Sequence, residues 1–212
     1  MSGCGCGGEL KFDGLSAAYK RVLWAVIAIN AAMFCVEMGA GLLAGSQALK
    51  ADALDFLGDT ATYSITLLVI GMPLVWRARA ALFKGLSLAA MGLWVLGSTA
   101  YQVLVLGLPQ AEIMGSIGLL ALAANLVAVL LLMKYRDGDA NVRSVWLCSR
   151  NDAIGNLAVI LAASGVWATG SAWPDLIVAA IMASLFLWSA TQILRQALAE
   201  LRAAQIVPQA AE

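Results

Sequence analysis

The sequence contains no histidine and little charge. Only 12% of its 212 residues are charged, whereas a typical soluble domain has about 25%. The missing histidine removes the commonest metal ligand and the commonest acid–base group of enzymes. It also excludes the His-Glu-x-x-His motif of zinc peptidases. We therefore do not expect this protein to be an enzyme.

Hydrophobic residues are abundant instead. They make up 62% of the chain, against about 45–50% in a soluble domain. A helix needs roughly 20 apolar residues to cross a membrane. Six such segments can be recognised, over residues 22–44, 51–75, 83–108, 113–133, 145–168 and 176–194. The sequence therefore predicts an all-α integral membrane protein with six transmembrane helices, and we expect no permanently bound cofactor.

Basic residues occupy alternate connections between these segments. Lysine and arginine lie in the N-terminal tail, the second and fourth connections and the C-terminal end, while the first, third and fifth connections hold only Lys50. Positive charge marks the cytoplasmic side of a membrane protein. We therefore expect both termini in the cytoplasm of a multi-pass protein of the cell (inner) membrane, with lipid and no nucleic acid as a partner. The expected parts are a cytosolic tail (1–20), a six-helix domain (21–197) and a short cytosolic tail (198–212).

Two carboxylates lie one helical turn apart in the second segment. They are Asp55 and Asp59, which share one helix face because residues four apart do so. An ionised aspartate at the bilayer centre costs several kcal/mol unless it is paired, faces water or binds a cation. A divalent metal ion in transit would offset that cost.

The fifth segment carries a second pair with the same spacing. Cys148 and Asp152 also share one face, and this segment runs antiparallel to the second. From the helical rise we expect Asp59 to lie level with Cys148, and Asp55 with Asp152, near the membrane midplane. The sequence thus predicts four metal ligands around one point.

Six further residues are candidates for accessory roles. Asp52 and Glu37 could line an exit path or be structural. Asn151 and Asn156 could orient the carboxylates or simply bond between helices. Cys4 and Cys6, in the stretch CGCGG, could deliver a soft metal or belong to a disordered tail.

Two stretches resemble the cation diffusion facilitator family of metal–proton antiporters. VEMGAGLLAGSQALKADALDFLGD is similar to the end of that family's first helix and the start of its second, with its Ser-x-Ala-Leu-x-Ala-Asp-Ala run. NVRSVWLCSRNDAIGNLAVI is similar to its fifth helix, in which Asn-x-Arg precedes a ligand-x-x-x-Asp pair. The resemblance covers roughly residues 20 to 200.

The resemblance implies a transport site made of Asp55, Asp59, Cys148 and Asp152. Zinc-type members commonly have histidine where this chain has Asp55 and Cys148. The histidine-rich loop of many members corresponds here to the short KYRDGDANVR. We expect a short member without the family's C-terminal cytoplasmic domain, and the resemblance implies a homodimer.

The predicted function is proton-coupled export of a divalent metal ion. Three carboxylates and a thiol repel one another when all are ionised, so we expect the empty site to hold protons that the metal displaces. A compact four-ligand site with a thiolate favours Zn²⁺, with Cd²⁺ as a second substrate. The oxygen-rich remainder leaves Fe²⁺, Mn²⁺ and Co²⁺ as alternatives. A channel or a non-transporting scaffold is the rival class.

Overall fold

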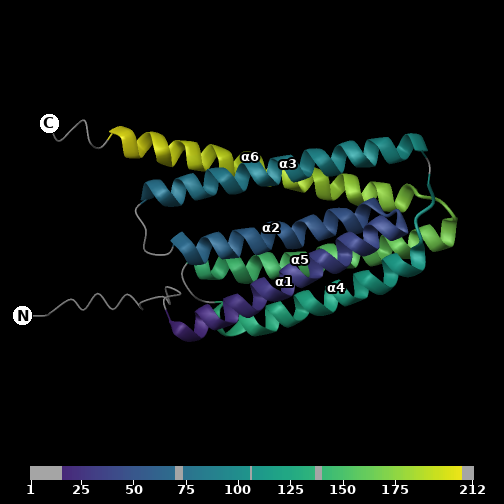
Figure 1. Cartoon of the computed structure of the whole chain (residues 1–212), viewed down its shortest axis with the longest axis horizontal. Coiled ribbons are helices and arrows are strands. Elements are labelled where there is room, and N and C mark those ends of the chain that lie inside the picture. Colours follow the sequence, from purple (N-terminus) through teal and green to yellow (C-terminus); the bar gives the residue numbers. More distant parts are fainter. Residues whose placement is uncertain (1–15, 70–73, 106, 137–139, 207–212) are drawn as a thin grey trace, which may run out of the picture.

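The structure, a computed structural model, describes residues 16–69, 74–105, 107–136 and 140–206. All regular structure in these ranges is helical, which confirms the all-α prediction. The helices are α1 (Ala17–Ala44), α2 (Gln47–Val69), α3 (Leu74–Val105), α4 (Ala111–Leu132), the 3₁₀ helix η1 (Met133–Tyr135), α5 (Ala140–Thr169) and α6 (Trp173–Ile206) (Figure 1).

Two helices extend well beyond the predicted spans. α3 begins at Leu74 rather than at residue 83, so Arg77 and Arg79 lie on a helix and not in a loop. α6 continues to Ile206, through residues that we expected in a tail. Both extensions are rich in alanine, leucine and arginine, which are strong helix formers. Hydropathy predicts the part of a helix that lies in lipid. It does not predict how far the helix continues into water.

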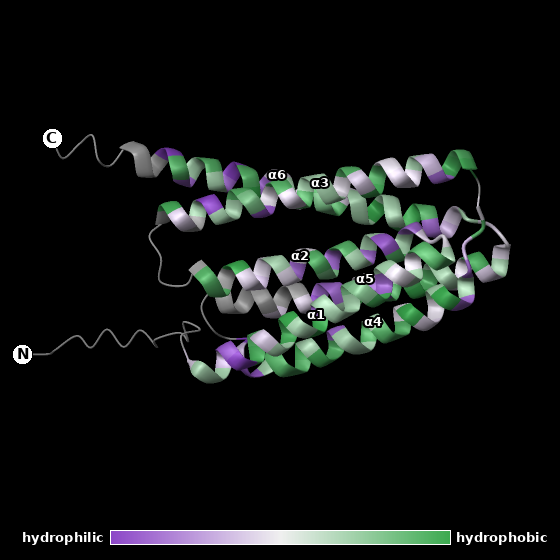
Figure 2. Cartoon of the chain, viewed as in Figure 1, coloured by the Kyte–Doolittle hydropathy of each residue, from purple (hydrophilic) through white to green (hydrophobic). Residues whose placement is uncertain are grey.

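α2 differs from the other five α-helices in its hydropathy. Among the described residues, the other five contain stretches long and apolar enough to cross a membrane. α2 carries Lys50, Asp52, Asp55 and Asp59 between its start and its middle. Figure 2 shows hydrophilic patches along this helix. α2 contacts α1, α3, α5 and α6. These neighbours keep its charged side chains away from lipid.

The helices form two groups. α1, α2, α4 and α5 pack together as a four-helix unit, while α3 lies along α6 as a separate pair (Figure 1). Glycine permits the close approach within the α3–α6 pair. A Cβ atom at Gly85 would lie 2.8 Å from Leu194, and one at Gly92 would lie 3.0 Å from Leu187. Small residues serve the same purpose in other membrane helix pairs.

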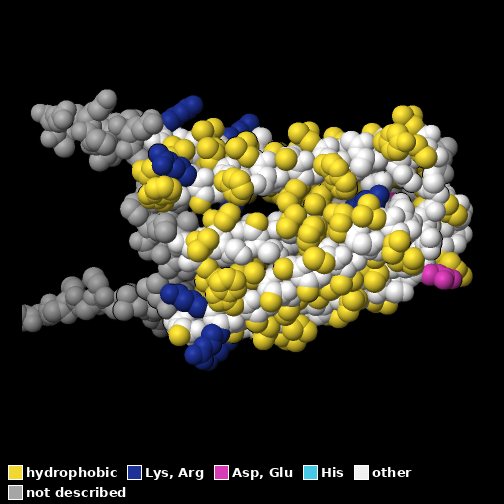
Figure 3. All heavy atoms as spheres, in the orientation of Figure 1, with side chains coloured by type: hydrophobic (Ala, Val, Ile, Leu, Met, Phe, Trp, Pro, Cys, Tyr) yellow, Lys and Arg dark blue, Asp and Glu magenta, His cyan; other side chains and the backbone are white. Residues whose placement is uncertain are grey.

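Three apolar cores hold the helices together. One, the shared core, draws on all six α-helices, from Ala44 and Leu49 to Val95, Met114 and Phe186. A small core contains Met33, Phe56 and Ala121. The remaining core contains residues of α1, α2 and α4 and lies toward the end where α1 begins. We call this the basic end, because lysine and arginine side chains gather there (Figure 3). Core packing therefore joins the α3–α6 pair to the four-helix unit far from the basic end.

The outer surface of the bundle is apolar. Leu43, Leu104, Trp167 and Trp188 are among many large hydrophobic side chains that are more than half exposed. Apolar side chains cover much of the face seen in Figure 3. Such a surface would be unfavourable in water. It suits a helix bundle surrounded by lipid.

α6 caps the start of α2. The carboxylate of Asp175 accepts hydrogen bonds from the backbone N–H groups of Gln47 at 2.8 Å and Ala48 at 3.0 Å. It also accepts the Ser46 hydroxyl at 2.5 Å, and Ser46 Oγ in turn accepts the N–H of Leu49 at 3.0 Å. The first N–H groups of a helix lack partners within the helix. Asp175 supplies them from another helix and so ties α2 to α6.

Candidate functional site

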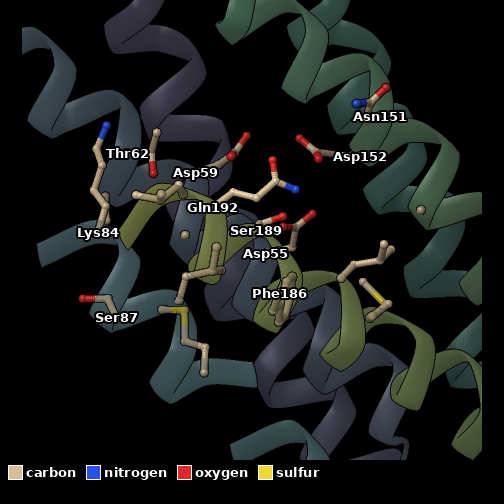
Figure 4. Close-up of a pocket in the computed structure, with 18 of the residues that line it drawn as sticks. Asp55, Asp59, Thr62, Lys84, Ser87, Asn151, Asp152, Phe186, Ser189 and Gln192 are labelled. Atoms are coloured by element: carbon tan, nitrogen blue, oxygen red, sulfur yellow. The ribbon is translucent and has the colours of Figure 1, made fainter. Parts of the chain in front are cut away.

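A cavity of about 580 Å³ lies between the α3–α6 pair and helices α2 and α5. Apolar side chains form much of its wall. Met91, Met182 and Phe186 belong both to this wall and to the shared core or its border. The polar lining is provided by Asp55, Asp59, Thr62, Lys84, Ser87, Asn151, Asp152, Ser189 and Gln192 (Figure 4).

Three of the four predicted ligands meet in this cavity. Asp55 and Asp59 enter from α2 and Asp152 enters from α5 (Figure 4). The carboxyl group of Asp152 lies within hydrogen-bonding reach of those of both Asp55 and Asp59. The four-residue spacing on α2 explains this arrangement, because it stacks Asp55 and Asp59 on the face that looks toward α5.

The fourth predicted ligand is placed only by its backbone. Cys148 lies in α5, one turn before Asp152, but its side chain is outside the described part of the structure. Cys4 and Cys6 also lie outside the described residues. Among the described residues, no three Cys, Asp or Glu side chains form a ready-made metal site. The acidic cluster is therefore not a closed ligand set in this conformation.

Two residues that the sequence reasoning missed act on Asp59. The Tyr63 hydroxyl, itself buried, donates a hydrogen bond to Oδ2 of Asp59. Lys84 of α3 lines the same cavity and interacts electrostatically with Asp59. The spacing of four between Asp59 and Tyr63 was a readable signal. Lys84 gave no such signal, because it was counted with the basic residues of the second connection.

Glu37 and Asp52 do not line the cavity. Both are almost fully buried and interact with each other between α1 and α2. In the described structure, both carboxylate oxygens of Glu37 and Oδ2 of Asp52 lack a hydrogen bond of good geometry. The pair is thus a second buried acidic group, beside the cavity and not part of its wall.

The two asparagines differ in position. Asn151 lines the cavity, but its amide points away from the three carboxylates (Figure 4). Its Oδ1 accepts a hydrogen bond from Arg150 at 3.3 Å, and the Arg150 guanidinium lies over Trp146. Asn156 is fully buried outside the cavity wall, and its amide has no partner among the described residues.

The fold and the cavity define a helical, multi-pass membrane protein with an acidic site between its helices. Residues 77–202 match the model of the cation efflux transmembrane domain, which is more than half of the chain. The chain therefore belongs to the cation efflux, or cation diffusion facilitator, family, as the two sequence stretches predicted. The match covers α5 and both helices of the α3–α6 pair, whereas α2 precedes it.

Bacterial relatives align over most of this chain. The metal cation efflux system protein CzcD of Cupriavidus metallidurans is 27% identical over 177 residues, which are 77% of this chain and 55% of that protein. The zinc transporter ZitB of Yersinia pestis is 28% identical over 195 residues, 86% of this chain and 62% of that protein. ZitB of Escherichia coli is 27% identical over the same length. The chain thus spans little more than half the length of these relatives.

Proposed function

We propose that this protein exports divalent transition-metal ions from the cytoplasm in exchange for protons. The observation that carries the proposal is the meeting of Asp55, Asp59 and Asp152, from two helices, in one cavity within the membrane bundle. Carboxylates at that depth are costly without a cation or water. Cys148, one turn from Asp152, is the proposed fourth ligand.

Proton exchange is the expected consequence of crowding these groups. Asp152 reaches both Asp55 and Asp59, and carboxyl groups this close cannot all be ionised without a cation between them. An arriving metal ion requires deprotonated ligands and releases their protons. Because the chain has no histidine, the aspartates and Cys148 carry these protons. The titrations belong to the cluster as a whole.

The charge of the two ends indicates which side of the membrane the cavity faces. The shared core joins all six helices away from the basic end, and the cavity lies on the basic-end side of its Met182 and Phe186. Positive charge favours the cytoplasmic side. We therefore place the cavity's access on the cytoplasmic side of the cell (inner) membrane, ready to receive a metal ion for export.

Zn²⁺ is the proposed substrate and Cd²⁺ a second one. Three carboxylates with one thiolate suit a four-coordinate ion that accepts sulfur. The relatives named zinc transporter support this choice. Fe²⁺, Mn²⁺ and Co²⁺ are the alternative substrates, because most of the donors are oxygen. Family membership further supports a homodimer. Accessory roles for Glu37 and Asp52, and delivery of metal by Cys4 and Cys6, remain part of the proposal on the strength of their residue types and positions.

The decisive experiment is metal-stimulated proton flux in proteoliposomes. Wild type is compared with Asp59→Ala and with the control Glu112→Gln, an exposed acid in the first turn of α4. We expect saturable flux in wild type and control, driven by a pH gradient, and none in Asp59→Ala. Metal flux that ignores the pH gradient would indicate a channel. Equal flux in all three proteins would mean that the aspartates do not form the transport site.

A further inference from the structure

We propose that Ser189 and Gln192 of α6 supply additional oxygen ligands and decide which ions the cavity accepts. The inference rests on the proposed function and extends it, because the site predicted from the sequence uses α2 and α5 alone. It assigns the ion selectivity of the cavity to the wall that faces the aspartates.

The positions of the two side chains carry the first step. Ser189 and Gln192 are three residues apart, which puts them on one face of α6. Both line the cavity that Asp55, Asp59 and Asp152 enter from the other side. Figure 4 shows the Gln192 amide directed toward the region between Asp59 and Asp152, with Ser189 near Asp55.

Their polar groups are not used elsewhere in the described structure. The hydroxyls of Ser184 and Thr191 on the same helix donate to backbone carbonyls of the preceding turn. Gln196, one turn beyond Gln192, donates its amide to Glu200 at 3.0 Å. Within the described part of the chain, no comparable bond engages Ser189 or Gln192. Their oxygens remain available to an ion in the cavity.

Coordination chemistry supplies the second step. The cavity is lined by three carboxylates, and these with Cys148 leave open positions on an ion that takes six ligands. Zn²⁺ is satisfied by four ligands, which Asp55, Asp59, Asp152 and Cys148 can provide. Mn²⁺ prefers six oxygen ligands. The hydroxyl of Ser189 and the amide oxygen of Gln192 are neutral donors, and they raise the coordination number without adding negative charge.

The two oxygens therefore matter most for ions that need more than four ligands. An ion of this kind bridges the cavity, with carboxylates on α2 and α5 and neutral oxygens on α6. A four-coordinate ion is held by α2 and α5 alone. We expect removal of the α6 oxygens to weaken Mn²⁺ binding much more than Zn²⁺ binding.

The test measures binding and transport side by side for Zn²⁺, Cd²⁺ and Mn²⁺. Gln192→Leu removes the amide, Ser189→Ala removes the hydroxyl, and Gln192→Glu keeps an oxygen at the same reach. Gln196→Leu is the matched control, since Gln196 bonds Glu200 and does not line the cavity. Affinity is read by competition with a metal indicator in detergent, and flux is read in proteoliposomes.

We expect Gln192→Leu to weaken Mn²⁺ binding by roughly tenfold, the scale seen when partners of metal ligands are removed. Zn²⁺ binding should change little, Ser189→Ala should act in the same direction, and Gln192→Glu should restore Mn²⁺ binding. Equal loss for all ions, or no loss for any, would overturn the proposal.

The two proposals fail in distinguishable ways. Asp59→Ala should abolish binding of every ion if the aspartates form the site, whatever α6 contributes. If wild type binds metal ions but does not transport them, the antiporter proposal is refuted. The ratio of Mn²⁺ to Zn²⁺ affinity in wild type and Gln192→Leu would still test the role of Gln192. No binding of any ion by wild type would refute both proposals.

Discussion

The Ser46 hydroxyl donates a 2.5 Å hydrogen bond to the carboxylate of Asp175, across 129 positions of sequence. The two residues lie at the ends of α2 and α6 that are farthest from the basic end. Asp175 is almost fully buried and also accepts two backbone N–H groups of α2. The helix that carries Asp55 and Asp59 is thus positioned by the helix that carries Gln192.

Replacing Asp175 should destabilise the whole bundle. Asp175→Ala leaves the Ser46 hydroxyl and the N–H groups of Gln47 and Ala48 without their acceptor. Hydrogen bonds to a charged group contribute about 1.5–3 kcal/mol each, so we expect a loss of about 2 kcal/mol or more in the free energy of unfolding. Thermal unfolding in detergent measures it. Glu112→Gln, an exposed acid, should unfold like wild type.

Tyr63→Phe should weaken metal binding while leaving the fold intact. The substitution removes only the hydroxyl that bonds Asp59, and the ring stays in its apolar core. Loss of a group that orients a metal ligand typically costs 10–100-fold in affinity. We expect an effect in the lower part of that range by Zn²⁺ titration. Tyr101→Phe, exposed on α3, is the control, and equal affinity in both variants would contradict the role of Tyr63.

Removing the charge of Lys84 should strengthen metal binding. An ammonium group that lines the cavity and interacts with Asp59 opposes an entering cation. A unit charge about 4 Å away is worth about 1 kcal/mol in water, a factor of about five in affinity. We expect Lys84→Gln to gain affinity of that order and to show a weaker dependence on salt. Arg79→Gln, whose guanidinium lies over Trp76, should change neither quantity. Weaker binding in Lys84→Gln would mean that the ammonium organises the site.

Alanine at Gly85 should separate α3 from α6. The new Cβ atom would lie 2.8 Å from Leu194, closer than side chains tolerate. Overpacking of this kind costs about 1–3 kcal/mol. Gly97→Ala on the same helix is the matched control, because nothing lies within 4 Å of its added Cβ. Thermal unfolding should show a lower midpoint for Gly85→Ala alone, and equal midpoints would mean that the α3–α6 contact tolerates a methyl group.

Helical periodicity in the sequence predicted the helical fold and the grouping of acidic residues from the second and fifth segments. The spacing of four in Asp55 and Asp59, and an antiparallel partner that carries Asp152, follow from helical geometry alone. The structure brings these three residues into one cavity. Whether they bind metal with Cys148 stays a prediction.

The position of the α6 side chains in the cavity wall could not be predicted from helical periodicity. Ser189 and Gln192 face the cavity because Gly85 and Gly92 let α3 lie against the neighbouring face of α6. That pairing joins helices distant in sequence, and periodicity within one helix does not reveal it. Lys84 was missed for a related reason, since it lies on α3 and the aspartate with which it interacts lies on α2.

The pairing of α3 with α6 also sets an order of events during synthesis. α3 ends at Val105 and α6 begins at Trp173, so about 70 residues must be made before α3 meets its main partner. At roughly 5–20 residues per second, the ribosome needs several seconds for this stretch. Throughout that interval lipid must cover the face of α3 that carries Gly85 and Gly92. A chain whose synthesis stalls after α5 would therefore leave α3 in the bilayer without its partner helix α6. We expect membrane quality control to recognise such an incomplete chain.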